Sequence, residues 1–156
     1  MTPAQRELLQ EINGYAQTAS TSQALMEQMV KCLHEKMARY NWVGFYLMDA
    51  ADPNYLVVGP FAGSFQPNVR IALSVGLCGQ AASSGKTVAV QDVTKDAQYL
   101  PGSSMVKSEV VVPIFAKKKL VGELDVESYF ADSFPKGEVE FVEACAEIAA
   151  KYFERV

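Results

Sequence analysis

The sequence predicts an α+β domain built around a central antiparallel sheet. Helical patterns occupy both ends of the chain, strand-like runs lie between them, and the segment Ser108 to Ser128 places two apolar runs on either side of three lysines. Such runs pair as an antiparallel hairpin, and helices at both ends can cover one face of the resulting sheet. With 156 residues and 49% hydrophobic content, the chain is long and apolar enough to form one domain, residues 1–156.

Two helices are expected before the first strand. Thr2 supplies an N-cap and Pro3 suits the first helical position, so a helix should begin at about Pro3. The helical pattern falters near Gly14 and in the polar segment 18–22. A second amphipathic helix then continues to about Arg39.

The first strand is expected over 41–48, where aromatic and β-branched residues dominate. Trp42, Gly44 and Tyr46 are two residues apart and therefore share one face of that strand. Two large aromatic side chains on either side of a glycine can leave a notch that accepts part of a ligand. The same spacing fits a core aromatic pair in which the glycine relieves crowding, and both alternatives remain open at this point.

Three further short strands are expected, over 55–61, 68–73 and 87–91. Before the last of these, Gly76 and Gly79 bracket Cys78 at the start of a small-residue helix that ends at Gly85. A helix N-terminus favours a thiolate, because its free N–H groups and dipole stabilise negative charge. Cys78 is therefore a candidate reactive residue, and a buried cysteine in a tight turn is the alternative.

A long polar loop, 92–107, leads into the central hairpin. Loops of this length in compact domains are usually functional or mobile. We expect its last part to fold over the hairpin as a lid, with a disordered connection as the alternative. The lid residues in this prediction are Pro101, Gly102, Ser103 and Ser104. After the hairpin, an amphipathic helix is expected over 138–154.

Alternation along the hairpin separates apolar from acidic side chains. Glu123, Asp125 and Glu127 point to one side, away from the expected helical layer. With the three lysines as the turn, Glu109 lies opposite Glu127. Like charges that face each other on a sheet are unfavourable, so this pattern indicates a bound cation, a shared proton or an ammonium-bearing ligand. A solvated sheet face is the alternative.

Charge and motif content argue against several classes of function. A net charge of −4 argues against a nucleic-acid partner, and the absence of a membrane-length apolar run or a secretory leader predicts a cytoplasmic protein with no membrane partner. Cys32, Cys78 and Cys145 are far apart without a CxxC pair, and His34 is the only histidine. We therefore expect no disulfide framework, no metal and no cofactor.

Five motifs, in this order, resemble the GAF-domain family of free methionine-(R)-sulfoxide reductases: NWVGFYL, LVVGPFAG, VRIALSVGLCGQA, SEVVVP and GELDVES. The likeness runs from about Asn13 to Tyr152. It implies a free-standing GAF domain, commonly a homodimer, with the terminal helices on one face of the sheet and a ligand pocket on the other. The implied partners are a small molecule, free methionine sulfoxide or a similar amino acid, and a thiol reductant.

The resemblance assigns ligand-binding roles residue by residue. The family's pocket tryptophan and tyrosine match Trp42 and Tyr46, and its ligand-holding carboxylates match Glu109, Asp125 and Glu127. The family usually has aspartate where this chain has Glu127, which lengthens that side chain by one methylene group. An acidic pocket would repel a phosphate, which argues against a cyclic-nucleotide sensor.

The cysteines depart from the family pattern. Of the family's three redox cysteines only the one in the GxCG turn is present, as Cys78, whereas Gly102 stands at the nucleophile position and Asn68 at the first cysteine position. Sulfoxide reduction needs a thiolate to attack sulfur and usually a second thiol to resolve the sulfenic acid. We therefore expect a ligand-binding, signal-sensing GAF protein with lost or altered chemistry. The alternatives are a reductase that uses Cys78 with an external thiol, and a regulatory or dimerisation module with a vestigial pocket.

Overall fold

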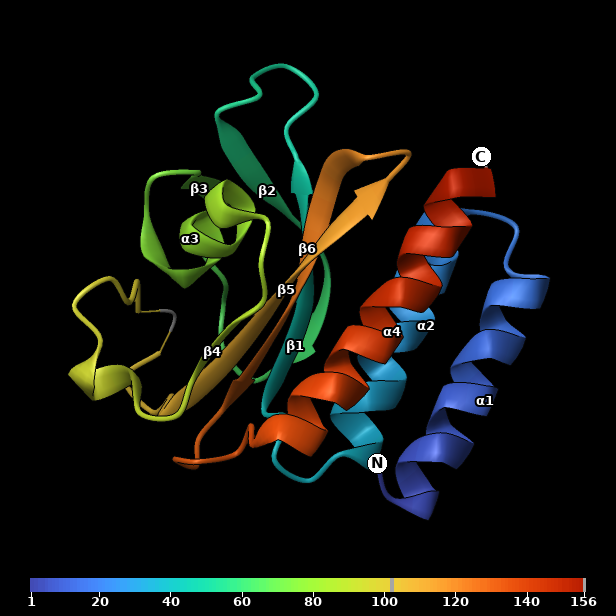
Figure 1. Ribbon diagram of the computed structural model, residues 1–156, viewed down its shortest axis with the longest axis horizontal. Coiled ribbons are helices and arrows are strands. Elements are labelled where there is room, and N and C mark those ends of the chain that lie inside the picture. Colours follow the sequence, from blue (N-terminus) through green and yellow to red (C-terminus); the bar gives the residue numbers. More distant parts are fainter. Residues whose placement is uncertain (102, 156) are drawn as a thin grey trace.

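The computed structural model of the protein describes residues 1–101 and 103–155, so Gly102 of the expected lid lies outside the described residues. Figure 1 shows the arrangement of the helices and strands. In chain order the elements are α1 (Pro3–Thr18), α2 (Ser22–Lys36), β1 (Trp42–Met48), β2 (Tyr55–Gly63), β3 (Arg70–Ala72), α3 (Gly76–Ser84), β4 (Val88–Val90), the 3-10 turn η1 (Val93–Lys95), β5 (Ser108–Ala116), β6 (Lys119–Ser128) and α4 (Lys136–Arg155).

One antiparallel sheet, with the strand order β3-β2-β1-β6-β5-β4, forms the centre of the described part of the molecule. Helices α1, α2 and α4 lie together on one face of this sheet, and α3 lies on the other (Figure 1). This arrangement confirms the predicted α+β architecture with the terminal helices on one face. It also places the β5–β6 hairpin in the sheet interior, because β6 pairs with β1 on its other side.

Helix α1 begins where the sequence predicts, but it is not interrupted near Gly14 as expected. The Gln5 backbone N–H donates to the Thr2 hydroxyl at 3.1 Å and the Thr2 N–H donates to the Gln5 side chain at 2.9 Å, which completes a capping box. Gly14 does not interrupt the helix, which continues to Thr18, because one glycine costs a helix only about 1 kcal/mol and the apolar face of α1 is buried. Helix α2 ends at Lys36, earlier than expected. Within residues 1–101 and 103–155, no helix combines the length and apolar character needed to cross a membrane.

The sheet separates two apolar cores. The larger core lies between the sheet and the terminal helices, and it contains Leu124 together with Cys32 and Cys145. The smaller core lies on the α3 side and contains Trp42 and Leu77. Two of the three cysteines are therefore separated from the acidic face by the sheet itself.

The β5–β6 hairpin has the predicted register but a different turn. Glu109 pairs with Glu127, as expected. The turn consists of Lys117 and Lys118 alone, at φ values of 52° and 67°, and Lys119 already belongs to β6. Two consecutive residues at positive φ are typical of the type I′ turn, whose twist matches that of the paired strands. A register shift further along the hairpin compensates for the shorter turn, so the acidic residues keep their predicted partners.

Candidate functional site

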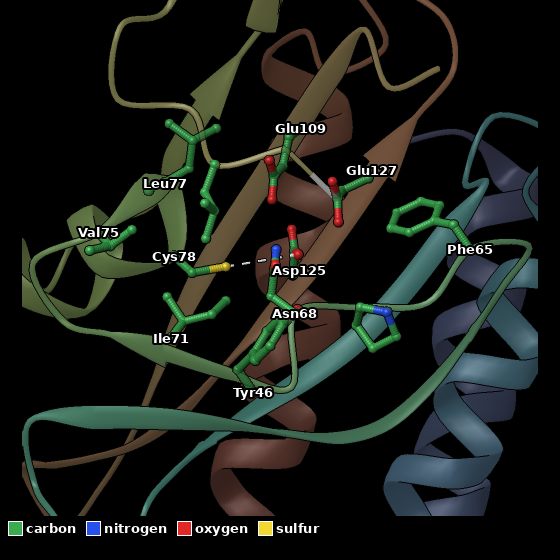
Figure 2. Close-up of a pocket in the computed structure, with 13 residues that line it drawn as sticks. Tyr46, Phe65, Asn68, Ile71, Val75, Leu77, Cys78, Glu109, Asp125 and Glu127 are labelled. Carbon is green, nitrogen blue, oxygen red and sulfur yellow. Dashed lines mark hydrogen bonds between the residues drawn. The ribbon is translucent and has the colours of Figure 1, made fainter. Parts of the chain in front are cut away.

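Three acidic side chains from the central hairpin converge on one buried space. Glu109 of β5 lies directly opposite Glu127 of β6, and Asp125 lies on the same face of β6. Their exposed fractions are only 4%, 5% and 1%, respectively. Figure 2 shows their carboxyl groups directed into a common space on the α3 side of the sheet. This face is thus enclosed and is not the solvated sheet surface considered as an alternative.

The electrostatic environment keeps these acidic groups protonated to unusually high pH. Burial raises the pKa of Glu109, Asp125 and Glu127 well above their ordinary values. Each group also experiences a neighbouring charge, from Glu127 on Glu109, from Glu109 on Asp125, and from Asp125 on Glu127. A protonated carboxyl group donates a hydrogen bond, which a carboxylate cannot do. The site can therefore offer both donors and acceptors to a ligand.

Cys78 approaches these groups from the first turn of α3. Its thiol donates to Oδ2 of Asp125, with an Sγ–Oδ2 distance of 3.8 Å, as the dashed line in Figure 2 marks. The expectation that the helix N-terminus favours a thiolate at Cys78 is wrong. Burial, and then the charges of Asp125 and Glu123, raise the pKa of the Cys78 thiol well above its usual value. Loss of hydration next to several carboxyl groups outweighs the partial charge of one helix N-terminus.

The two predicted aromatic residues have different positions. Tyr46 lines the pocket. Trp42 is fully buried behind it and stacks on Phe61 and Phe65, with ring centroids 5.6 Å apart in both pairs. The predicted notch is filled by the indole itself, because a Cβ atom on Gly44 would lie 2.3 Å from the Trp42 ring. Trp42 thus fits the core-packing alternative, and Phe65, which the sequence analysis missed, supplies the aromatic wall.

The loop between β4 and β5 covers part of the pocket. Leu100 lines the pocket, and the carbonyl of Pro101 accepts a hydrogen bond of 3.5 Å from the side chain of Asn68, which also lines it. Ser103 and Ser104 do not line the pocket. Of the described residues in the predicted lid, Pro101 therefore reaches the site. Leu100, the residue just before the predicted lid, lines the pocket.

The space that these residues enclose is small. The pocket has a volume of about 20 Å³, which is enough for a water molecule but far too little for an amino acid. A ligand of that size therefore requires the covering segments to move apart. The lining combines carboxyl groups and one thiol with apolar side chains, and it consists of Tyr46, Phe65, Pro67, Asn68, Ile71, Val75, Gly76, Leu77, Cys78, Leu100, Glu109, Asp125 and Glu127.

A fourth acidic residue, Glu123, lies beside the site and was not among the predicted binding residues. It is completely buried, and it interacts with Cys78. Neither of its carboxyl oxygens has a hydrogen-bond partner among the described residues. Strand alternation alone places Glu123 on the same face as Asp125, so this signal was available in the sequence, although the resemblance assigned Glu123 no role.

Comparison with known proteins relates the whole arrangement to one family. Residues 21–153 match the GAF domain family. The chain is 38% identical to GAF domain-containing protein A of Dictyostelium discoideum, over 80% of this chain and 71% of that protein. It is 36% identical to the free methionine-R-sulfoxide reductase of Saccharomyces cerevisiae, over 71% of this chain and 62% of that protein. The match to the yeast protein thus spans less than two thirds of its length.

Solved structures show the same relation in three dimensions. The free methionine-R-sulfoxide reductase from Neisseria meningitidis, solved in complex with its substrate, has a TM-score of 0.90 and 33% identity, covering 96% of this chain and 88% of that chain. The reduced form of fRMsr of Staphylococcus aureus has a TM-score of 0.87 and 32% identity, covering 95% and 94%. The protein therefore belongs to the GAF domain family, and its relatives there include free methionine-R-sulfoxide reductases.

Proposed function

We propose that the protein binds a small zwitterion, free methionine sulfoxide or a similar amino acid, in the pocket formed by Glu109, Asp125 and Glu127. The observation that carries this proposal is the convergence of three buried carboxyl groups on one enclosed space. The ligand class follows from relatives that are named for the free amino-acid sulfoxide. The chain's own residues supply the groups that would recognise it.

The chemistry of the pocket suits both polar ends of such a ligand. An ionised carboxylate accepts hydrogen bonds from the ligand's ammonium group, and a carboxyl group that keeps its proton donates one to the sulfoxide oxygen. The raised pKa values of Glu109 and Asp125 favour this mixture of ionised and protonated groups. Phe65 and Ile71 offer an apolar surface to the methylthio end.

Binding requires the pocket to open. Because the enclosed volume is about 20 Å³, the segments that carry Asn68 and Leu100 must separate before an amino acid can enter. The Asn68–Pro101 hydrogen bond, at 3.5 Å and near the surface, is a weak link between these segments. Opening at this point leaves the hairpin that holds the carboxyl groups unchanged.

The experiment that tests binding is a calorimetric titration of the chelator-treated protein with methionine sulfoxide and related amino acids. Saturable binding is expected, and Asp125→Asn should weaken it at least about tenfold, since a charged hydrogen bond contributes roughly 1.5–3 kcal/mol. Glu140→Gln, a change on the exposed surface of α4, is the matched control and should bind normally. If none of these amino acids binds, the pocket is vestigial and the regulatory or dimerisation module becomes the better account.

A working reductase is the second candidate, and it is favoured by the position of Cys78 on the pocket wall. In that reaction the Cys78 thiolate attacks the sulfoxide sulfur, methionine leaves, and Cys78 becomes a sulfenic acid that two external thiols reduce to the thiol, a disulfide and water. Turnover with a thiol reductant that disappears in Cys78→Ser would establish this candidate. Absence of turnover, followed by activity in Gly102→Cys but not in the control Ser104→Cys, would show that binding is intact and only the nucleophile is missing.

The remaining expectations from the family resemblance belong to this proposal as well. They are a homodimer, a cytoplasmic location and a thiol reductant as partner in the case of catalysis. Light scattering coupled to size-exclusion chromatography tests the first, with a mass close to twice the 17.1 kDa of the chain as the expected result. A single-chain mass at high concentration would contradict the dimer.

A further inference from the structure

The pocket and the residue beside it, Glu123, carry buried oxygen atoms that lack partners among the described residues. Oδ1 of Asp125 and both carboxyl oxygens of Glu123 are buried without a hydrogen-bond partner, and the two residues are exposed by 1% and 0%. Buried polar atoms are normally paired, because an unpaired one loses its hydration without compensation. Ionised carboxylates cannot pair one another, because their oxygens only accept hydrogen bonds. The missing partner is a hydrogen-bond donor or a cation: a proton on a neighbouring carboxyl group, a water molecule or a bound positive charge.

Three potential ligand atoms lie close enough together to share one ion. The Cys78 sulfur and one carboxyl oxygen each from Glu109 and Asp125 all lie within 4.8 Å of one another. Zinc bonds of roughly 2.0–2.3 Å hold neighbouring ligand atoms roughly 3.3–3.8 Å apart in a tetrahedron. The Cys78 Sγ to Asp125 Oδ2 distance of 3.8 Å is already close to the separation of about 3.5–3.7 Å that a sulfur and an oxygen ligand of one zinc ion would have. Figure 2 shows these three side chains directed toward the same space.

The size of the enclosed space selects for a small occupant. A volume of about 20 Å³ holds one water molecule, and a metal ion that has lost most of its hydration shell needs less room. The thiol narrows the choice of metal ion, because thiolate ligands prefer borderline or soft transition metals to calcium or magnesium. Calcium also takes only oxygen ligands, so a site in which a cysteine sulfur is one of three ligands does not suit it.

We propose that Cys78, Glu109 and Asp125 bind one divalent transition-metal ion of the zinc class, with ligands contributed by α3, β5 and β6. Three protein ligands leave the fourth tetrahedral position open to a water molecule or an exogenous group. Glu123, beside Cys78, adds a further acidic group, which burial holds neutral until a cation favours its ionised form. The ligands come from positions far apart in the sequence, which is why a search for CxxC spacing does not find them. This inference goes beyond the proposed function, since it requires no amino-acid ligand.

The test uses the full-length protein after removal of metals with a chelator and dialysis. Calorimetry with Zn²⁺ should show one site per chain, and titration with Co²⁺ should produce a thiolate-to-metal charge-transfer band in the near ultraviolet. Cys78→Ser should abolish that band, and Asp125→Asn should weaken Zn²⁺ binding at least about tenfold, the usual lower limit even for changes outside the ligand set. Mg²⁺ and Ca²⁺ should not compete at concentrations that saturate with Zn²⁺.

A matched control separates this site from the other thiols. Cys32 is also buried, next to Tyr15 with an Sγ–Oη distance of 4.0 Å, but it lies on the opposite side of the sheet. Cys32→Ser should therefore retain the band and the stoichiometry. A band that survives in Cys78→Ser, or the absence of stoichiometric Zn²⁺ binding by the folded wild type, would overturn the inference and leave shared protons or water molecules as the partners of the buried oxygens.

The outcomes also separate this inference from the proposed function. Methionine sulfoxide binding is measured on the metal-free protein, and Zn²⁺ and Co²⁺ binding is measured without any amino acid. Metal binding without sulfoxide binding supports the ion site and contradicts the amino-acid pocket. Sulfoxide binding without metal binding supports the pocket and overturns the ion site.

Discussion

Gly44 determines how the aromatic layer behind the pocket is packed. A Cβ atom at this position would lie 2.3 Å from the ring of Trp42 and 2.9 Å from Cβ of Phe61. Both neighbours lie in a stack that also includes Phe65, so neither can move without disturbing the pocket wall. The absence of a side chain at Gly44 therefore allows the indole to lie flat against β1.

Replacing Gly44 with alanine should destabilise the protein, because the added methyl group overpacks a rigid aromatic stack. The expected loss in the free energy of unfolding is about 1–3 kcal/mol, or more if the stack cannot adjust. Urea denaturation followed by circular dichroism measures it.

Gly14→Ala is the matched control, and it should change the free energy of unfolding in the opposite direction. No atom lies within 4 Å of the added methyl group, and Gly14 lies inside a helix. Alanine should stabilise the protein there by about 0.5–1 kcal/mol. Equal effects at the two positions would contradict the packing argument.

At the residue scale, the sequence predicts which face a side chain occupies better than how deeply it is buried. Strand alternation correctly placed Asp125, Glu127 and Tyr46 on the pocket face. It could not show that Trp42 packs behind Phe65, because that depends on a segment that forms no part of β1. The sequence pattern does not predict the raised pKa of Cys78 for the same reason, since it follows from burial of the thiol and then from carboxyl groups on β5 and β6, far from α3 in the sequence.

At the scale of elements, the β5–β6 turn is the place where local conformation and sequence disagree. Lys118 adopts a left-handed conformation with φ of 67°, which costs a non-glycine residue about 1–2 kcal/mol. Lys118→Gly should therefore stabilise the hairpin, by a net of about 0.5–1 kcal/mol after allowance for the greater freedom of glycine in the unfolded chain. Thermal and urea denaturation measure the effect.

Lys119→Gly is the natural comparison for this turn. Lys119 is the first residue of β6 and is not among the residues with positive φ, so glycine gains nothing there and should lower stability by about 0.5–1 kcal/mol. If both changes stabilise the protein, or neither does, backbone strain at Lys118 does not explain the effect of Lys118→Gly.

Elements with a local chemical signature were predictable, and elements defined by distant contacts were less so. The Thr2–Gln5 capping box predicted the start of α1, and the alternation along β6 predicted which of its side chains share the acidic face. The two-residue turn was not foreseen, because three identical lysines give no indication of where the turn ends. Local propensity predicts a break near Gly14, because it takes no account of the burial of the apolar face of α1.

At the scale of the whole molecule, the sheet separates the side that holds the larger core from the side that holds the candidate pocket. The terminal helices build the larger core on one face, which allows the other face to carry buried acidic groups that oppose stability. The acidic face could be predicted from β5 and β6 alone. Its enclosure could not, because the covering residues come from the loops that carry Phe65 and Leu100.

This division predicts that the metal-free protein loses stability as the pH rises above the acidic range. The folded-state pKa values of Glu109, Asp125 and Glu127 are raised by burial above the ordinary values of 4.5 for glutamate and 3.8 for aspartate, at which the unfolded chain titrates. Between the unfolded and folded pKa values the folded protein holds more protons, so the free energy of unfolding falls with pH. The contribution is fully present below the unfolded values and is lost as the pH rises through the folded ones. Urea denaturation in chelator-containing buffer should give a higher midpoint at about pH 5.5 than at about pH 8, with a slope of up to about 1.4 kcal/mol per pH unit for each retained proton.

The variants that test this dependence differ only in where a carboxyl group is lost. Glu127→Gln should flatten the slope, because it removes one titrating group and relieves the others of its charge. Glu140→Gln, on the exposed face of α4, should leave the slope unchanged. The acidic groups with lowered pKa values, Glu11, Asp49 and Asp92, titrate below this window and do not contribute to it. A midpoint that is constant or rises between the two pH values would mean that the buried acidic groups are already compensated, and the site would then have to hold positive charge even after chelation.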